Sequence, residues 1–106
     1  MTKTATRTWE AKRTEETREV ESVLKSAGFE KVDAYRYNSA SIRVRVIDTR
    51  FERLPIAKRD DMVEPFLEKL RPETQGDIIS LFTFAPSELK QHLLNTEFED
   101  PSPSML

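Results

Sequence analysis

Basic side chains crowd the middle of this 106-residue chain and are the first candidates for a binding surface. Guanidinium and ammonium groups bind phosphates and carboxylates, so several of them within a short segment would suit an anionic partner. The other interpretation is that they pair with acids of the same fold, as Arg59 would with Asp60 or Glu64 on one helix. The candidate binding residues are Arg43, Arg45, Arg50, Arg53, Lys58 and Arg59.

Two carboxylates, Asp60 and Asp77, are the next candidates for chemistry. A carboxylate pair can act as acid and base or hold a hard metal ion, although Asp is also common at the start of a helix. The chain has no Cys and a single His, His92, which excludes thiolate chemistry and His-rich metal clusters. It contains no Gly-rich phosphate loop, Ser-His-Asp set or His-Glu-x-x-His motif. The sequence therefore predicts a non-catalytic binding protein without a cofactor.

The charges are divided unevenly along the chain. Residues 1–59 carry 14 basic and 9 acidic side chains, whereas residues 60–106 carry 3 basic and 10 acidic ones, for a net charge of −2. This division favours either an anionic partner for the basic half or ion pairs between the two halves. No apolar run is long enough to span a bilayer, and the first residues lack the apolar core of a signal peptide. We therefore expect a cytoplasmic protein without membrane contact.

The basic residues belong to a predicted β-hairpin and the segment after it. Residues 41–48 alternate apolar Ile42, Val44 and Val46 with Arg43 and Arg45, which is typical of a half-buried strand with an arginine face toward solvent. Residues 31–38 show no clean apolar face and suit an edge strand. The turn at residues 38–39 makes these two strands an antiparallel hairpin.

The prolines after the hairpin predict where the next helices begin. Pro55 suits the first turn of a short helix, because its fixed φ is already helical. Pro65 is tolerated within a first turn, where its missing N–H is not needed, but not deep in a helix. We therefore expect the main helix to restart at Asp60 or Asp61 and to run to the Arg-Pro pair at residues 71–72.

Three further elements complete the prediction. Apolar residues at helical spacing indicate a first helix over residues 14–27, which Gly28 would end in the left-handed conformation. Residues 77–84 are the most apolar run in the chain and should form a central, buried strand. A final helix is expected over residues 87–95.

These elements predict an α+β fold, a two-layer sandwich in the order α-β-β-α-α-β-α. Its three-stranded mixed sheet would carry helices on one face. The domain would span residues 14–95, with a flexible N-terminal tail at residues 1–13 and a flexible acidic tail at residues 96–106. The expected buried residues are Ile42, Val44, Val46, Phe66, Leu67, Leu70, Ile79 and Leu81.

This order and the residues after the hairpin resemble the BolA family, whose fold is similar to the type II KH domain. BolA proteins carry Phe-x-Gly after a hydrophobic strand, then an Arg-His pair that opens the main helix, and a short closing motif after the last strand. Phe51 and Arg59 match the Phe and the Arg at the family's spacing, and Pro86-Ser87-Glu88-Leu89 is similar to the closing motif. The resemblance covers about residues 20–89.

The departures from the family concern its functional residues. Arg53 replaces the Gly, which predicts a turn that does not depend on glycine. Asp60 replaces the His of the pair, and Asp77 replaces a second His at the last strand if a one-residue insertion is allowed. In the family these histidines help to hold an iron–sulfur cluster shared with a monothiol glutaredoxin. Carboxylates suit such a cluster less well, so the resemblance implies an adaptor that binds a protein partner without the cluster.

The same resemblance leaves a second function open. Some members of the family act as DNA-binding regulators, and the six basic residues could contact phosphates while Tyr35 or Tyr37 stacks on bases. The chain lacks the Gly-x-x-Gly loop of KH domains, and its pI of about 5.5 is low for a nucleic-acid binder. We therefore rank a regulatory protein-binding module first and a KH-like nucleic-acid-binding domain second.

Overall fold

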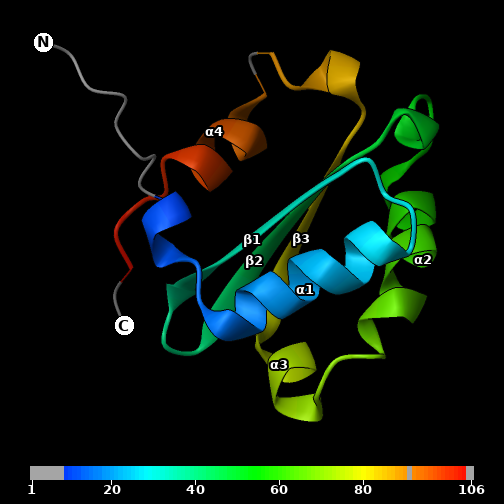
Figure 1. Cartoon of the computed structure of the whole chain (residues 1–106). Helices are drawn as coiled ribbons and strands as arrows, with labels where there is room; N and C mark the ends of the chain where they lie inside the picture. Colours follow the sequence, from blue (N-terminus) through cyan, green and yellow to red (C-terminus); the bar gives the residue numbers. More distant parts are fainter. Residues whose placement is uncertain (1–8, 91, 105–106) are drawn as a thin grey trace, which may run out of the picture.

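A three-stranded mixed sheet forms the centre of the molecule (Figure 1). The computed structural model describes residues 9–90 and 92–104. Strand β1 (Lys31–Asn38) pairs antiparallel with β2 (Ser41–Ile47), which pairs parallel with β3 (Ile78–Phe84). The α+β fold, the mixed sheet and the order α-β-β-α-α-β-α are therefore confirmed.

The hairpin of β1 and β2 follows the alternation in its sequence. Val32 lies opposite Val46 and Ala34 lies opposite Val44, so these side chains share one face of the sheet. All four are buried in the larger hydrophobic core, together with Ile42. The register is strongly specified, because a slip by one residue would turn every one of these side chains to the other face.

Helix α1 (Glu15–Ser26) covers this apolar face. Thr14 caps its N-terminus in a reciprocal pair of hydrogen bonds with Thr17, which satisfies donors that a helix end leaves unpaired. Gly28 follows the C-terminus with a φ of 101°, a conformation that a glycine adopts without a steric cost. The ends predicted for this helix agree with the structure to within a residue or two.

Helix α2 (Ile56–Leu67) begins at the elbow, by which we mean residues 48–56, from the end of β2 to the first residue of this helix. The helix is continuous through Pro65, so the predicted restart at Asp60 or Asp61 is wrong. Pro65 lies only two residues from the helix end, and its missing hydrogen bond therefore disturbs the last turn alone. A separate short helix, α3 (Pro72–Asp77), precedes β3. Neither these helices nor any other in the described part of the chain is long and apolar enough to cross a membrane.

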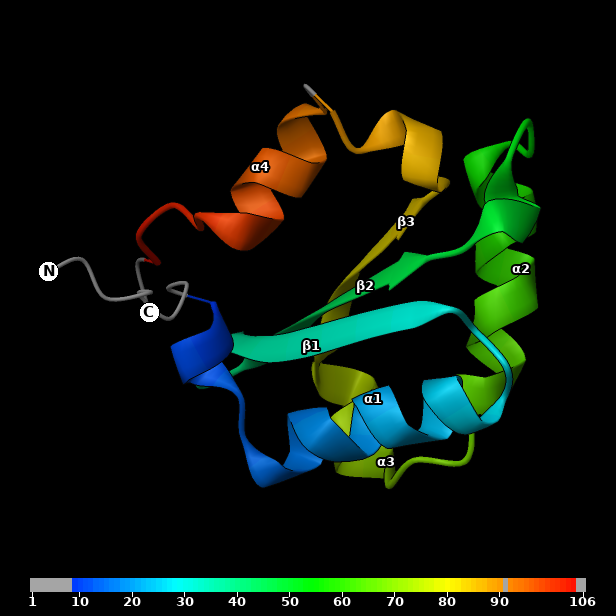
Figure 2. The ribbon, with the colours of Figure 1, turned by 45° about the horizontal axis from the view of Figure 1, so that its top comes forward.

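The opposite face of the sheet is also covered, which differs from the expectation that all helices lie on one face. Helix α4 (Leu93–Glu99) lies across the sheet from α1, as Figure 2 shows. Its Phe98 is fully buried with Trp9 and Tyr35, at ring-centroid distances of 5.4 Å from Trp9 and 4.8 Å from Tyr35. The hydroxyl of Tyr35 donates a hydrogen bond of 2.8 Å to the Phe98 carbonyl.

The predicted tails are therefore wrong where the structure describes them. Trp9 is buried and a 3₁₀ turn follows it at Glu10–Lys12, while α4 extends to Glu99 in place of the helix expected over residues 87–95. After α4, the Tyr37 hydroxyl donates to the Ser102 carbonyl at 2.7 Å. Residues 1–8 and 105–106 of the predicted tails lie outside the described residues. Trp9 and Phe98 pack into the folded structure because burial of each ring removes a large aromatic surface from water.

Candidate binding site

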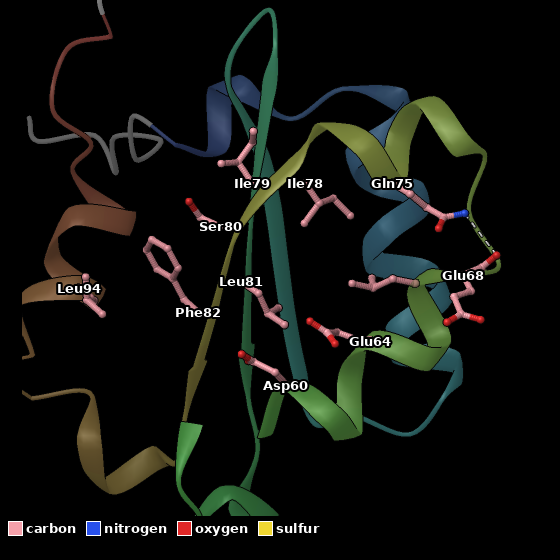
Figure 3. Close-up of a pocket in the computed structure, with 11 residues that line it drawn as sticks. Asp60, Glu64, Glu68, Gln75, Ile78, Ile79, Ser80, Leu81, Phe82 and Leu94 are labelled. Atoms are coloured by element: carbon pink, nitrogen blue, oxygen red, sulfur yellow. Dashed lines mark hydrogen bonds between the residues drawn. The ribbon is translucent and has the colours of Figure 1, made fainter. Parts of the chain in front are cut away.

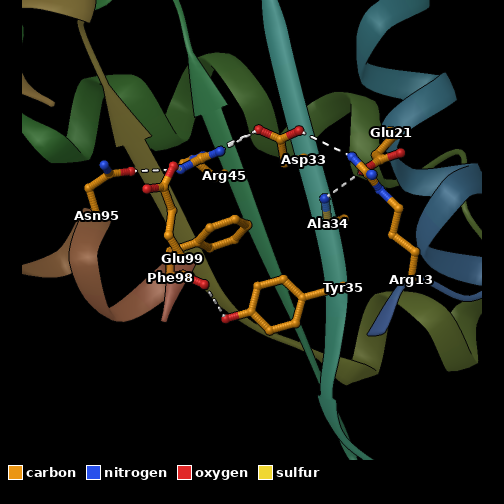
Figure 4. A network of polar contacts seen from close by, with 9 residues as sticks. All are labelled: Arg13, Glu21, Asp33, Ala34, Tyr35, Arg45, Asn95, Phe98 and Glu99. Atoms are coloured by element: carbon orange, nitrogen blue, oxygen red, sulfur yellow. Dashed lines mark hydrogen bonds and ion pairs between the residues drawn. The ribbon is translucent and has the colours of Figure 1, made fainter. Parts of the chain in front are cut away.

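Arg45 is buried rather than exposed, so its predicted place on a solvent face is wrong. Its side chain is 2% exposed and its Nη2 lies 2.7 Å from Asp33 Oδ2 (Figure 4). Its Nη1 donates to Asn95 and Glu99 of α4, also at 2.7 Å. The cause is α4, which covers this face and supplies acceptors for the guanidinium. Arg45 is therefore a structural ion-pair residue.

Arg43 is also engaged within the fold. Its guanidinium lies 3.7 Å from the ring centroid of Tyr37, and its Nη1 donates to Glu97 Oε2 at 3.0 Å. The side chain is 13% exposed. Stacking on Tyr37 and pairing with Glu97 leave little of Arg43 for an external ligand.

Arg59 connects the elbow with the segment after β3. Its Nη1 and Nη2 each donate to one carboxylate oxygen of Glu88 at 2.7 Å, a bidentate pair. Its Nε donates to the Leu54 carbonyl at 2.8 Å, and Nη1 also donates to the Thr83 carbonyl at 3.0 Å. The Arg59 guanidinium lowers the pKa of Glu88 to about 2. The predicted alternative of an internal ion pair holds for Arg59, although its acid is Glu88 rather than Asp60 or Glu64.

Arg50 pairs with the acid that caps the turn after β2. Its Nε and Nη2 donate to the two oxygens of Asp48, both at 2.9 Å. Asp48 is fully buried and also accepts from the backbone N–H of Glu30 and Arg50. These hydrogen bonds, with the Arg50 guanidinium first, lower the pKa of Asp48. Arg50 keeps half of its side chain exposed, but its charge is compensated.

Arg53 and Lys58 are exposed, and neither makes an ion pair with another described residue. Arg53 has a φ of 63°, the left-handed conformation that favours glycine. The turn therefore has a backbone conformation that favours glycine, although the residue that adopts it is an arginine. Of the six predicted basic residues, these two alone are exposed without a described ion pair.

Asp60 and Asp77 do not form a common site. Asp77 forms an ion pair with Arg36 at 2.8 Å, and Arg36 forms a second ion pair with Glu16 at 2.7 Å. Asp60 instead lines a hollow to which Asp77 does not contribute. Burial, and the neighbouring charge of Asp61, raise the pKa of Asp60. Within the described residues no group of three His, Asp or Glu side chains is placed to hold a metal ion.

Strand β3 lies at the edge of the sheet, not at its centre as its composition predicts. The strand order is β1-β2-β3, so within residues 9–90 and 92–104 β3 pairs with β2 alone. Ile79 is 69% exposed, contrary to the prediction that it is buried, and Leu81 is only partly buried. Phe66 and Leu67 are partly buried as well, whereas the other predicted core residues, Ile42, Val44, Val46 and Leu70, are buried.

Two hollows run along the free edge of β3 and share Leu81, Phe82 and Leu94. Their volumes are about 640 Å³ and about 420 Å³. We call this combined depression the β3 groove. Figure 3 shows β3 between α2, which contributes Asp60 and Glu64 and is followed by Glu68, and α4, which contributes Leu94. The smaller hollow reaches the elbow at Leu54, Pro55 and Ile56.

Sequence reasoning missed the β3 groove because periodicity does not give the order of strands. A run such as residues 77–84 has the same composition whether it is central or at an edge. A scan against protein-family models and a search of curated proteins both give no match for this chain.

Proposed function

We propose that this protein is a non-catalytic binding module whose partner occupies the β3 groove. The observation that carries this proposal is an edge strand left open between two helices, with apolar side chains exposed along it. Ile56, Ile79 and Leu94 line the groove and are 56%, 69% and 53% exposed. Burial of each would contribute on the order of 1 kcal/mol to binding.

One end of the groove reaches the elbow, close to the predicted basic residues, but its lining there is mainly apolar. The elbow residues Leu54, Pro55 and Ile56 form one end of the groove. The Arg59–Glu88 pair also lines this end and connects α2 to the chain after β3. A surface held in this way loses little conformational entropy when a partner binds.

The resemblance to BolA adaptors supports the same function. Arg53 has the positive φ expected where the family carries glycine. Arg59 and Glu88, which belong to two separate family-like motifs, contact each other. Asp60, at the position of a family histidine, lines the groove. A divergent adaptor that binds a protein through this groove would account for all three features.

The experiment is a comparison of partner recovery with two matched variants. Leu94→Asp places a charge in the groove, whereas Leu93→Asp places the same charge on the adjacent residue, which is 83% exposed and does not line the groove. Each tagged protein is incubated with its native cytosol, and bound proteins, monothiol glutaredoxin and nucleic acid are quantified. We expect a protein that wild type and Leu93→Asp recover and Leu94→Asp does not. Equal recovery by both variants would contradict the proposal.

A further inference from the structure

We propose that the occupant of the β3 groove is an extended, cationic segment of another protein, added to β3 as a fourth strand. This inference rests on the proposed function and specifies the chemistry of the partner. A strand that adds to a sheet edge binds through its backbone and is selected through the side chains that it presents on each face. At the β3 edge, these two requirements are unpaired backbone groups and a distinct lining on each side of the strand.

The direction of the β3 backbone is given by two carbonyls. The Phe84 carbonyl accepts from the Asp48 N–H at 3.0 Å and so points toward β2. The Thr83 carbonyl accepts from Arg59 Nη1 at 3.0 Å and points toward the groove. Because these directions alternate along a strand, Leu81 presents its N–H and C=O to the groove, and Thr83 presents its N–H.

The N–H and C=O of Leu81 are open to a partner, whereas Thr83 is only 3% exposed and its carbonyl already accepts from Arg59. Among the described residues, none outside the sheet hydrogen-bonds to the backbone of Leu81. The register with β2 is continuous over residues 80–84 but shifts at Ile42 and Arg43, opposite the start of β3. A bulge at this place bends the edge and ends regular pairing. Between this bulge and the buried Thr83 the added strand is short, with about three residues in the ladder.

The α2 side of the groove is acidic. Asp60, Glu64 and Glu68 follow one another at intervals of four residues, so they lie in a row along the helix. Arg59 and Glu88, the other charges in the lining, neutralise each other. Asp60 Oδ1 is buried and accepts no hydrogen bond from the described residues. A cationic side chain on this side would pair with the row and donate to Asp60.

The α4 side of the groove is apolar, with Phe82 and Leu94 in its lining. Side chains of an added strand alternate between the two faces of the sheet. The strand that fits therefore alternates Lys or Arg, toward α2, with Val, Ile or Leu, toward α4. This alternation is the specific sequence feature that the groove selects.

Charge argues against two other occupants. Pairing of β3 with β3 of a second copy about a two-fold axis would place α2 beside its own copy, with the rows of Asp60, Glu64 and Glu68 facing each other. Like charges so arranged are destabilising. The same row would repel the phosphates of a nucleic acid. A cationic peptide is attracted instead.

The probe is a blocked seven-residue peptide that alternates Lys and Val, titrated into ¹⁵N-labelled full-length protein. We expect amide shifts concentrated at residues 80–82 and slower hydrogen exchange at Leu81. A matched peptide of Glu and Val should bind at least about tenfold more weakly. The substitution pair Glu64→Gln and Glu68→Gln, both at the surface of α2, should reduce that preference. Equal binding of the two peptides overturns the charge assignment.

Backbone pairing is tested with two N-methylated forms of the Lys and Val peptide. In an added strand only one set of alternate amides faces β3, so methylation of one set abolishes binding and methylation of the other is tolerated. Equal affinities of the two forms overturn strand addition. Sedimentation of the free protein as a dimer that Leu94→Asp dissociates also overturns it, in favour of a second copy.

The two proposals fail in different ways. If Leu94→Asp loses a native partner but no Lys and Val peptide shifts β3, strand addition is wrong and the binding module stands. If the peptide binds at β3 but Leu94→Asp and Leu93→Asp recover native proteins equally, the strand site is real and the proposed cellular function is wrong.

Discussion

Arg59 of α2 and Glu88 of the turn after β3 form a bidentate ion pair, with both N–O distances at 2.7 Å. The two residues are 29 positions apart, and the Arg59 side chain is only 5% exposed. Arg59 also donates to two backbone carbonyls, so one guanidinium joins the elbow, β3 and the turn after it. The pair therefore holds the elbow end of the β3 groove together.

Removal of Arg59 should be strongly destabilising. Arg59→Ala leaves two carbonyls and the partly exposed Glu88 without their donor, which should cost about 2 kcal/mol. Lys58→Ala, at the exposed neighbouring position, should change the free energy of unfolding by less than about 0.5 kcal/mol. Urea unfolding of the two variants measures the difference. Similar midpoints for both would show that the pair contributes little.

Stability should fall in acid in a way that depends on this pair. The pKa of Glu88 in the folded protein is about 2, below its ordinary value of 4.5. The ionised carboxylate therefore stabilises the fold above pH 4.5, and this stabilisation is lost as the pH falls toward 2. The lowered pKa of Asp48 acts in the same direction. In Glu88→Gln the free energy of unfolding should decline less steeply over this range, and parallel pH profiles would refute the assignment.

Replacement of Arg53 by glycine should stabilise the protein. Arg53 has a φ of 63°, and a non-glycine residue in this region costs about 1 kcal/mol, of which Arg53→Gly recovers a part. Arg53→Ala removes the same charge but retains a Cβ, so it is the matched control and should not stabilise. Thermal or urea unfolding of both variants separates backbone strain from charge. Equal effects of the two substitutions on stability would show that loss of the Arg53 charge, rather than relief of backbone strain, is the cause.

The aromatic cluster beneath α4 should be visible by fluorescence. Trp9 is the only tryptophan and is 3% exposed, so its emission should be blue-shifted in the native protein. Phe98→Ala removes a ring 5.4 Å from the indole, which should shift the emission to the red and cost roughly 3 kcal/mol. Leu93→Ala, on the same helix but exposed, should change neither. A native emission maximum typical of exposed indole would contradict this packing.

Binding to duplex DNA should be weak and sensitive to salt. Arg53 and Lys58 are the predicted basic residues left exposed without a described ion pair, so the log–log slope of affinity against salt should be about −1.8. The double substitution Arg53→Ala and Lys58→Ala should nearly abolish that slope. Fluorescence anisotropy with a labelled duplex measures it at several salt concentrations. Tight binding at physiological salt, lost in the double variant, would favour the nucleic-acid function instead.

Local signals in the sequence determined the hairpin and the first helix. The alternation of Ile42, Val44 and Val46 has the period of a strand, and these residues are buried as it predicts. Thr14 and Gly28 lie at the two ends of α1, where capping and positive φ require such residues. These features depend on neighbours within a few positions, so the sequence alone was sufficient to predict them.

The tertiary structure decided which polar residues are free and where the site lies. The alternation in β2 predicts that Arg45 faces solvent. Helix α4, about 50 positions later, covers it instead and supplies Asn95 and Glu99 as hydrogen-bond acceptors. The composition of β3 is typical of a central strand. The strand order, which the tertiary structure alone gives, places it at an edge. Both outcomes depend on contacts between segments far apart in the chain. Hydrophobic burial drives these contacts and is non-directional, so no local pattern records which distant surface covers which.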